Sequence, residues 1–279
     1  MLTYNPPIED MRHIIEKVLN IHGLDKAAEL DEEMIDAILH EAAKLARDIL
    51  APLNRVGDEF PMECKDGVVI TPPGFKDAYS QYCESGWNSV PFAPEYEGQG
   101  LPYTLSFPLQ EMWQSANMSF SLCPLLNQGA IEAIEHHASD DVKQMFLPRM
   151  ISGEWTGTMN LTEPQAGSDL SVVRTKAEPQ ADGMYKITGQ KIYITFGEHD
   201  FSENIIHLVL ARTPDAPEGV KGISLFVVPK FKLNADGSIG ERNDLICSGI
   251  EHKLGIHASP TCTMTFGENG GATGYIVGE

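Results

Sequence analysis

Positive charge is the first thing that this sequence lacks: 20 lysines and arginines stand against 40 aspartates and glutamates, a formal net charge of −20 at pH 7. A chain with this balance repels phosphate backbones, and no basic patch interrupts it, so we expect no nucleic-acid partner. Anionic ligands are not excluded, because backbone amides at turns and helix starts bind phosphate groups without side-chain charge.

Long apolar runs are also absent. No segment approaches the roughly 20 consecutive apolar residues that a membrane-spanning helix needs, so we expect no membrane span. The opening residues, Met-Leu-Thr-Tyr-Asn-Pro-Pro-Ile, contain neither the basic nor the apolar region of a signal peptide. These absences predict a cytoplasmic protein.

Cysteines are few and scattered. Their number is odd and none of them forms a Cys-x-x-Cys pair, which argues against a disulfide scaffold and against a zinc site. No other metal site is expected, because His252 and His257 have no partners at ligand spacing. A scattered free cysteine is most often a small buried hydrophobe, and we expect this of Cys64, Cys83, Cys123, Cys247 and Cys262.

The motifs of nucleotide-binding α/β folds are missing as well. Gly98-Gln-Gly100 begins like a dinucleotide fingerprint, but it lacks the third glycine and the strand-turn-helix setting. There is no P-loop. A Rossmann fold is therefore excluded.

The spacing of apolar residues divides the chain near residue 154. Before that point the spacing is helical, most clearly from Met34 to Leu50, and we expect Pro52 to end that helix. After it the period drops to two, and turn residues separate the apolar segments. The pattern predicts helices over 75–84, 105–116, 125–137 and 141–151, and strands over 185–188, 190–195, 205–211, 222–229, 259–266 and 273–277. The fold class is α+β, with an all-helical domain over residues 1–153 and a β domain over residues 154–279.

One informative stretch opens the β half and runs from Met159 to Asp169. It breaks at Pro164, and Gly167 then removes steric bulk while Ser168 adds a hydroxyl group. Such a backbone suits the approach of a pyrophosphate or of a cofactor edge. An ordinary polar turn after a strand is the alternative.

A second stretch, Gly189-Gln-Lys-Ile-Tyr-Ile-Thr195, reads as a strand. In regular alternation Tyr193 and Thr195 point to one face, while Ile192 and Ile194 point to the other. An aromatic ring and a hydroxyl two residues apart make a wall for a flat heteroaromatic ring. The alternative is an ordinary half-buried strand in which Tyr193 and Thr195 lie on the polar face without binding a ligand.

The order of these segments resembles that of the acyl-CoA dehydrogenase family: Thr162-Glu-Pro-Gln-Ala-Gly-Ser-Asp169, Lys176-Ala-Glu, Asp182-Gly183, then Thr188-Gly-Gln-Lys-Ile-Tyr-Ile-Thr195. Glu95-Tyr-Glu-Gly-Gln-Gly100 and Lys253-Leu-Gly-Ile-His-Ala-Ser-Pro-Thr261 match further signatures, so the resemblance covers nearly the whole chain. Residues 125–133 and Phe196-Gly-Glu-His-Asp200 are most similar to the long 3-methylmercaptopropionyl-CoA dehydrogenase-like subgroup.

The resemblance implies a helical N-terminal domain, a β-barrel-like middle domain and FAD held in a cleft between that domain and a C-terminal helical bundle, which these residues do not include. It assigns Thr162 to the flavin ring system and Ser168 to the junction of cofactor and acyl-CoA. Two departures from the family pattern are Gln165, where glycine is usual, and Tyr193, where Trp is more familiar. The flavin-lining residues implied are Met159, Asn160, Leu161, Thr162, Gly167, Ser168, Tyr193, Ile194 and Thr195.

The implied reaction is the α,β-dehydrogenation of an acyl-CoA thioester, as in fatty acid metabolism. A carboxylate removes the α-proton while the flavin accepts the β-hydride, and hydrogen bonds polarise the thioester carbonyl. In the family this base is a glutamate from the C-terminal region, so we assign no catalytic residue here and expect the base beyond Glu279. Glu163 belongs to the cofactor motif, and the fragment alone is expected to be inactive.

The resemblance further implies a homo-oligomer that passes electrons to an electron-transfer flavoprotein. The alternatives are an acyl-CoA oxidase of the same superfamily and a non-catalytic flavoprotein or interaction module. Glu198-His199-Asp200 is not expected to form an acid-base centre, because three consecutive side chains do not converge on one point.

Overall fold

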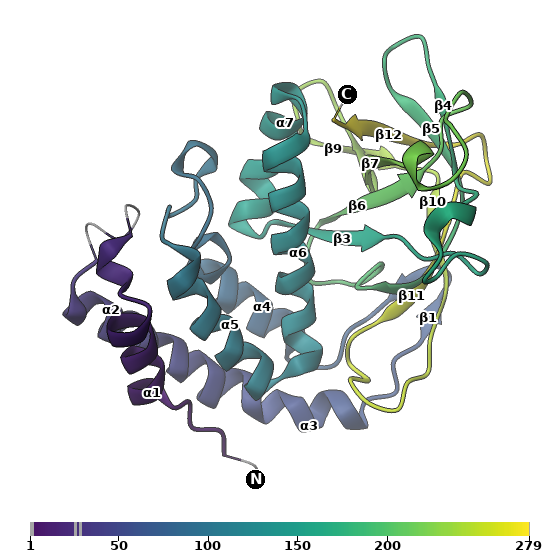
Figure 1. Cartoon of the computed structure of the whole chain (residues 1–279). Helices are drawn as coiled ribbons and strands as arrows, with labels where there is room; N and C mark the ends of the chain where they lie inside the picture. The colour runs from purple at the N-terminus through teal and green to yellow at the C-terminus, as the bar shows by residue number, and fades with distance from the viewer. Residues whose placement is uncertain (1–2, 25–26, 28–29, 279) are drawn as a thin grey trace.

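A helical layer lies against a mixed β-sheet in the computed structural model, which describes residues 3–24, 27 and 30–278 (Figure 1). The first half of the chain is helical and the second half is built of strands, which confirms the α+β fold class. A short hairpin of β1 (Cys64–Lys65) and β2 (Val68–Val69) interrupts the helices. The α-helices are α1 (Ile8–His13), α2 (Glu32–Lys44), α3 (Ala51–Glu59), α4 (Phe75–Glu84), α5 (Tyr103–Ala116), α6 (Met118–His137) and α7 (Asp140–Ser152).

Side chains cap three of these helices at their N-termini. Asp31 accepts a hydrogen bond from the third residue of α2, Asn117 does so for α6 and Ser139 for α7. Each cap satisfies one backbone N–H that has no partner inside its helix. The Asn117 cap starts α6 at Met118 and not at residue 125, where the sequence predicted it, because burial of Phe120 overrides the weak helix propensity of the first turns.

The prediction that Pro52 ends the second helix is wrong. The chain passes from α2 through a π-helical turn, Leu45–Leu50, and continues in α3 as far as Glu59. In the wide turn the N–H of Ala51 already bonds to the carbonyl five residues back, at Ala46. Pro52 then stands in the first turn of α3, where the missing donor is least needed.

The β half forms one sheet with the strand order β10-β11-β5-β12-β7-β6-β3, and β4 pairs with β5. All of its pairs are antiparallel except β3 with β6. The strands are β3 (Trp155–Asn160), β4 (Lys176–Pro179), β5 (Tyr185–Thr195), β6 (Asn204–Ala211), β7 (Ser224–Pro229), β10 (Leu245–Ile250), β11 (Thr261–Phe266) and β12 (Ala272–Val277), and a separate hairpin holds β8 (Phe231–Leu233) and β9 (Ile239–Arg242). The two strands predicted over 185–188 and 190–195 are a single strand, β5.

Close contact between α6 and β3 joins the two halves. A Cβ on Gly157 would lie 2.4 Å from the Cβ of Ala130, so only glycine fits at this crossing. The N–H of Gly157 donates to Oδ1 of Asn127 over 2.8 Å, and the amide of Asn127 donates to the carbonyl of Met150 over 3.0 Å. Asn127 is fully buried and therefore fixes α6, α7 and β3 relative to one another.

The loop between β10 and β11 is fastened to α3 by His257. Its Nδ1 lies 3.0 Å from the carbonyl oxygen of Asp58, and its Nε2 lies 2.9 Å from that of Lys253. Because both neighbours are carbonyl oxygens, both ring nitrogens donate only when the imidazole is protonated. The hydrogen bonds to Asp58 and Lys253 raise the pKa of His257.

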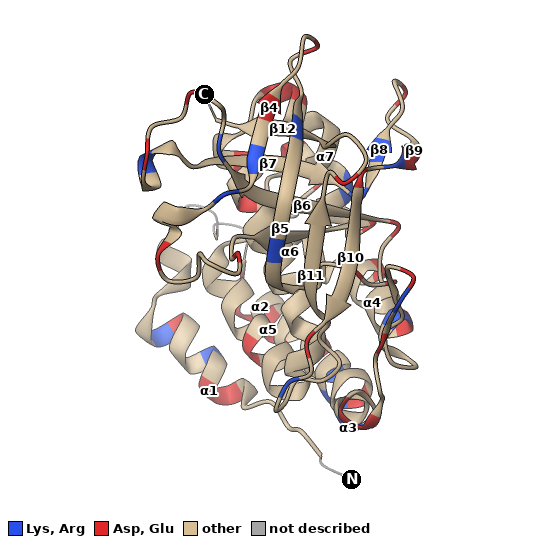
Figure 2. Cartoon of the chain, turned by 90° about the vertical axis from the view of Figure 1, so that its right-hand side faces the viewer, with Lys and Arg blue, Asp and Glu red and all other residues tan. Residues whose placement is uncertain are grey.

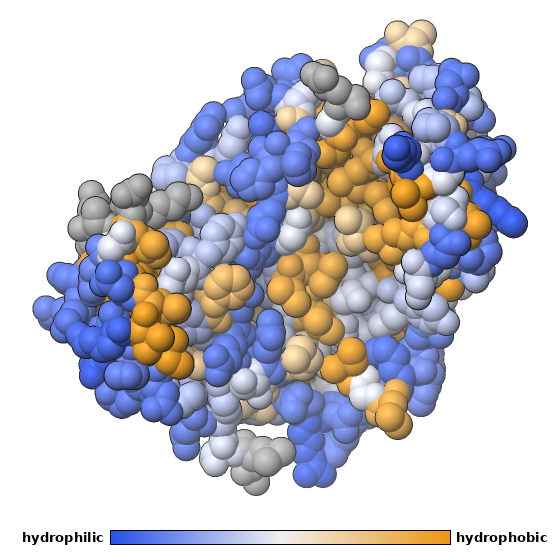
Figure 3. Space-filling model, viewed as in Figure 1, coloured by the Kyte–Doolittle hydropathy of each residue, from blue (hydrophilic) through white to orange (hydrophobic). Residues whose placement is uncertain are grey.

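Charge and apolar surface are unevenly distributed. Figure 2 shows charged residues mainly on helices and loops, while the strands that face the viewer are mostly uncharged. Figure 3 shows apolar surface beside α7, over the region that β12 and β7 occupy in Figure 1. Leu225, Tyr275 and Val277 of these strands are partly buried and pack against the core around Phe146. Among the described residues no helix has the length and apolar character to cross a membrane.

Candidate functional site

A tight turn follows β3 at the centre of the first candidate stretch. The N–H of Glu163 donates to the carbonyl of Ala166 and the N–H of Ala166 donates back to Glu163, each over 3.0 Å. Gly167 and Ser168 follow on the surface. A Cβ added to Gly167 would meet no atom within 4 Å, so the backbone here is open to a ligand.

The Glu163 side chain points into the protein, where only 3% of the residue is exposed. Its carboxylate accepts hydrogen bonds from the N–H of Arg174 at 2.7 Å and from the N–H and hydroxyl of Thr175 at 3.0 and 2.5 Å. Burial alone would raise the pKa of Glu163, but hydrogen bonds from Lys191, Thr175 and Arg174 outweigh it and lower the pKa to about 2. The carboxylate is therefore charged at neutral pH and serves structure.

Lys191 of β5 completes this network and is itself fully buried. Its Nζ donates to Glu163 over 2.8 Å and to the carbonyl of Leu161 over 3.1 Å. Burial lowers the pKa of Lys191, and the interaction with Glu163 opposes that effect. One ammonium group therefore ties the turn after β3 to the middle of β5.

One backbone bond and one side-chain bond hold the same two segments together. The N–H of Ile192 donates to the carbonyl of Thr162 over 2.9 Å, and the hydroxyl of Thr158 donates to the carbonyl of Thr195 over 2.5 Å. The two stretches that the sequence singled out, one at the end of β3 and one in β5, thus lie side by side.

A bulge re-aims the side chains of β5. Ile194 pairs with Cys262 and Lys191 with Met264, so two residues of β5 oppose one residue of β11. Tyr193 takes up the extra length with a φ of 61°, and 58% of its surface is exposed. Ile194 is buried, but Ile192 is only half-buried, so the strict alternation predicted for this strand is wrong at Ile192.

The candidate residues differ in what they can present. Asn160 and Ile194 are buried, and the amide of Asn160 donates to Nδ1 of His207 over 3.2 Å. Burial, with Lys230 close by, lowers the pKa of His207 to about 3, so this ring is neutral. The candidates with accessible surface are Met159, Leu161, Thr162, Gly167, Ser168, Tyr193 and Thr195.

Arg212 fixes the segment after Ser168. Its guanidinium donates to the carbonyls of Ser171 over 2.7 Å and Val173 over 2.8 Å. Sequence reasoning named neither this arginine nor Lys191 as a site residue, although Lys191 lies inside the second candidate stretch. A lysine inside a predicted strand, next to Ile192, was the available signal, because a buried charge requires a partner.

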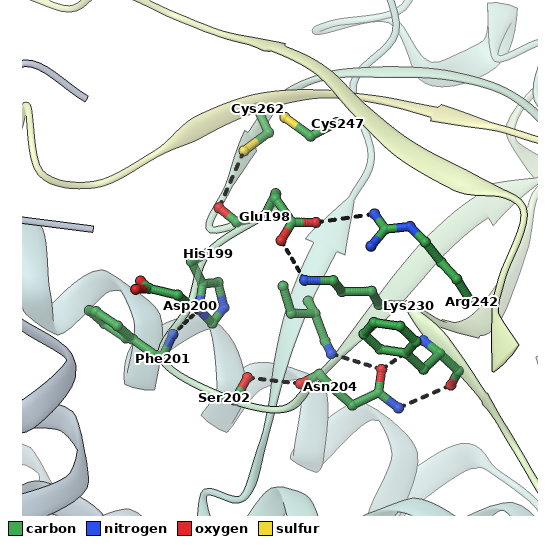
Figure 4. A network of polar contacts seen from close by, with 12 residues as sticks. Glu198, His199, Asp200, Phe201, Ser202, Asn204, Lys230, Arg242, Cys247 and Cys262 are labelled. Atoms are coloured by element: carbon green, nitrogen blue, oxygen red, sulfur yellow. Dashed lines mark hydrogen bonds and ion pairs between the residues drawn. The ribbon is translucent and has the colours of Figure 1, made fainter. Parts of the chain in front are cut away.

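Glu198, His199 and Asp200 do not converge on one point, as the sequence analysis expected, and Figure 4 shows Glu198 facing away from the other two. Glu198 forms a buried ion pair with Lys230, and Asp200 accepts from the N–H and hydroxyl of Thr71 at 3.1 and 2.6 Å. Nδ1 of His199 accepts from a backbone N–H, and burial lowers the pKa of this ring to about 3. Within the described part of the chain, no three His, Cys, Asp or Glu side chains form a group that could hold a metal ion.

Two family models match the chain: the acyl-CoA dehydrogenase N-terminal domain over residues 31–154 and the acyl-CoA dehydrogenase middle domain over residues 158–268. The chain belongs to the acyl-CoA dehydrogenase family. Both candidate stretches lie within the middle-domain match.

Relatives with functional names agree with this membership. A 3-methylmercaptopropionyl-CoA dehydrogenase of Ruegeria pomeroyi is 49% identical over 100% of this chain and 47% of its own length. A butyryl-CoA dehydrogenase of Syntrophomonas wolfei is 46% identical over 88% of this chain and 41% of its own length. The chain thus spans about half the length of the curated relatives it matches.

Solved structures share the fold. The butyryl-CoA dehydrogenase of Megasphaera elsdenii superposes with a TM-score of 0.67 at 22% identity, over 87% of this chain and 58% of that one. An acyl-CoA dehydrogenase of Bacillus anthracis complexed with FAD gives a TM-score of 0.69 at 22% identity, over 90% and 38% of the two chains.

Proposed function

We propose that the protein containing this chain is an FAD-dependent acyl-CoA dehydrogenase that converts an acyl-CoA thioester to a 2,3-enoyl-CoA. The carrying observation is the junction at which Lys191 and Ile192 of β5 bind the turn that contains Thr162 and Glu163. Relatives named 3-methylmercaptopropionyl-CoA dehydrogenase and butyryl-CoA dehydrogenase, at 49% and 46% identity, support the same reaction.

The residues at the junction fit a flavin. Tyr193 offers an exposed aromatic ring, and Thr162 and Thr195 offer partly exposed hydroxyl groups. The open backbone at Gly167 and the exposed hydroxyl of Ser168 suit the approach of a phosphate-bearing chain. Met159 and Leu161 would add apolar contacts, whereas the buried Asn160 and Ile194 would contribute through their backbone. When bound, FAD supplies the acceptor for the β-hydride of the substrate.

The base that removes the α-proton is proposed to lie outside the described residues. In the β half the buried carboxylates are already engaged: Glu163 by Lys191 and Glu198 by Lys230. A low pKa, held down by several donors, makes Glu163 a poor proton acceptor. Ser168 is proposed to lie where the acyl-CoA meets the flavin, and this chain would supply the cofactor wall while another region supplies the base.

Electron-transfer flavoprotein is the proposed acceptor of the electrons, and the protein is proposed to be a cytoplasmic homo-oligomer. We also propose that the boundary between the helical and β domains lies at residues 153 and 154, where α7 gives way to β3.

An anaerobic titration tests the proposal. The full-length protein is loaded with FAD and titrated with butyryl-CoA and with 3-methylmercaptopropionyl-CoA, while the flavin absorbance is followed. Bleaching by either thioester is expected, and no bleaching is expected with free CoA. A full-length protein that binds no flavin, or a bound flavin that no acyl-CoA reduces, would refute it. Peroxide formed on admission of oxygen, without an added acceptor, would instead identify an oxidase.

A Thr162→Val and a Tyr193→Ala variant connect the activity to this site. Both are expected to weaken FAD binding or slow flavin reduction at least tenfold. The matched control is Thr188→Val, which alters an exposed threonine of the same strand outside the candidate set. An equal effect in the control variant would place the flavin elsewhere.

A further inference from the structure

The β1–β2 hairpin packs on β10, although β1 and β10 lie far apart in the sequence. Sγ of Cys64 in β1 lies 3.6 Å from Sγ of Cys247 in β10, at a separation of 183 residues. The same Cys64 thiol approaches the Cys247 carbonyl oxygen to 3.4 Å. At the hairpin turn a Cβ on Gly67 would come within 2.6 Å of Ile246, so the hairpin is pressed closely against the strand.

The two thiols are unequally accessible. Cys64 is partly exposed, whereas Cys247 is buried. A third thiol, Cys262 of β11, is also buried and lies 3.9 Å from the carbonyl oxygen of Glu198 (Figure 4). An oxidant from solvent therefore meets Cys64 first, and Cys247 is the sulfur already in contact with it. None of these residues belongs to the proposed flavin wall.

We propose that Cys64 and Cys247 form a reversible disulfide when the protein meets a peroxide, and that this bond fastens the hairpin of the helical half to the sheet. The Cys64 thiolate attacks one oxygen of hydrogen peroxide, which gives a sulfenic acid and releases hydroxide. The Cys247 sulfur then attacks Sγ of Cys64, the S–S bond forms, and the hydroxyl leaves as water. In total two thiols and one peroxide yield one disulfide and two waters, and a dithiol reductant reverses the reaction.

The surroundings of Cys64 determine how fast its thiol is oxidised. Burial, followed by the neighbouring Cys247, raises the pKa of Cys64 to about 11. The thiolate is the reactive form, so the rate of oxidation should rise roughly tenfold per pH unit as long as the pH stays well below that value. The raised pKa should therefore make the oxidation slower than that of a cysteine with an ordinary pKa.

The hairpin and the segment after it connect the two halves of the fold. Thr71, two residues after β2, donates from its N–H and hydroxyl to Asp200 beyond β5. A disulfide between Cys64 and Cys247 would add a covalent bond to this set of polar contacts. The oxidised protein should accordingly resist separation of the hairpin from the sheet more than the reduced protein does.

Peptide mapping of the whole chain tests the inference. The folded protein is treated with hydrogen peroxide at pH 7, 8 and 9, blocked with iodoacetamide and digested without reductant. Mass spectrometry is expected to find the Cys64 and Cys247 peptides joined, at a rate that rises roughly tenfold per pH unit, and dithiothreitol should separate them. In thermal melts the oxidised wild type should unfold at a higher temperature than the reduced wild type.

Single substitutions provide the controls. Cys64→Ser and Cys247→Ser should abolish the joined peptide and the peroxide-dependent shift in melting temperature, whereas Cys262→Ser should keep both. Cys83→Ser, at the other partly exposed cysteine, should also keep both. A bond between Cys247 and Cys262, over-oxidation of Cys64 without a bond, or an unchanged melting temperature on oxidation would overturn the inference.

Discussion

The buried pair of Glu163 and Lys191 allows the sharpest test of how the candidate site is held together. The side chains are 3% and 0% exposed, and their charged atoms lie 2.8 Å apart. Removing one partner of such a pair leaves an uncompensated buried charge, which typically destabilises a protein by about 3–5 kcal/mol. The lowered pKa of Glu163 has the same direction, because hydrogen bonds from Lys191, Thr175 and Arg174 stabilise its charged form.

Glu163→Gln is expected to lower the free energy of unfolding by about 3–5 kcal/mol, because it leaves the Lys191 ammonium with the Leu161 carbonyl as its hydrogen-bond partner. Lys191→Met should cost about 3 kcal/mol, the lower end of that range, since Arg174 and Thr175 still donate to the carboxylate. The double variant should lose less than the sum of the two, by about 2 kcal/mol or more, because no buried charge is then left unpaired.

Urea unfolding of the four proteins, followed by tryptophan fluorescence, measures this cycle. The surface pair Arg55 and Glu59 is the matched control, with the same 2.8 Å separation but 83% and 62% exposure, so Glu59→Gln should cost less than about 1 kcal/mol. Two results would refute the view that the pair holds the turn against β5. One is a loss in the free energy of unfolding at Glu163 or Lys191 as small as in the control, and the other is a double variant whose loss equals the sum of the two single losses.

The pH dependence of the stability that Glu163 contributes follows from the direction in which its pKa is shifted. The pKa of Glu163 is lower in the folded protein than in the unfolded chain, so its contribution to stability is present above about pH 4.5. It is lost as the pH falls from 4.5 towards about 2. The stability difference between wild type and Glu163→Gln should therefore shrink across that window and stay constant between pH 6 and 8.

Three further outcomes are expected. Protonated His257 holds the loop between β10 and β11, and its pKa is higher in the folded protein than in the unfolded chain. Its contribution to stability is therefore present below about pH 6.5 and is lost as the pH rises through the pKa of the folded state. Amide exchange of this loop should accelerate between pH 6 and 9 in the wild type but not in His257→Ala. Gly157→Ala should lower the free energy of unfolding by about 1–3 kcal/mol, because the added Cβ clashes with α6. Gly167→Ala has open space around it and should change the free energy of unfolding by less than about 0.5 kcal/mol, but it should weaken FAD binding. Chemical denaturation measures the first effect in both variants, and flavin titration measures the second. Tyr193→Trp, the residue more familiar in the family, should keep the FAD content of the full-length protein, because this side chain is 58% exposed and has room for the larger ring.

Local patterns predicted the elements better than their boundaries. Helical spacing located α4 at both ends and α7 to within one residue at each end. The same reasoning failed at Pro52, because a π-helical turn had already shifted the hydrogen-bond pattern before the proline. It also left out β3, whose residues are nearly all buried and therefore show no alternation of apolar and polar positions, and β10, in which Cys, Ser and Gly give a weak apolar signal.

For the candidate site too, part of the arrangement was predictable from the sequence and part was not. The order of the two candidate stretches in the sequence was enough to recognise the family. The side-chain directions in β5 were not predictable, because the bulge at Tyr193 arises from pairing with β11, a strand some seventy residues later in the chain. The role of Lys191 was likewise not predictable, because its ion-pair partner Glu163 lies outside β5.

By itself, then, the sequence determined which half of the chain is helical and which family the chain belongs to, and it singled out two candidate segments for a ligand, because periodicity, turn residues and motif order are local properties of the chain. Only the tertiary structure decided that Lys191 neutralises Glu163 and that the widely spaced Cys64 and Cys247 touch. Contacts of this kind depend on strand order and register, which are fixed by the packing of the whole sheet and not by any segment of it.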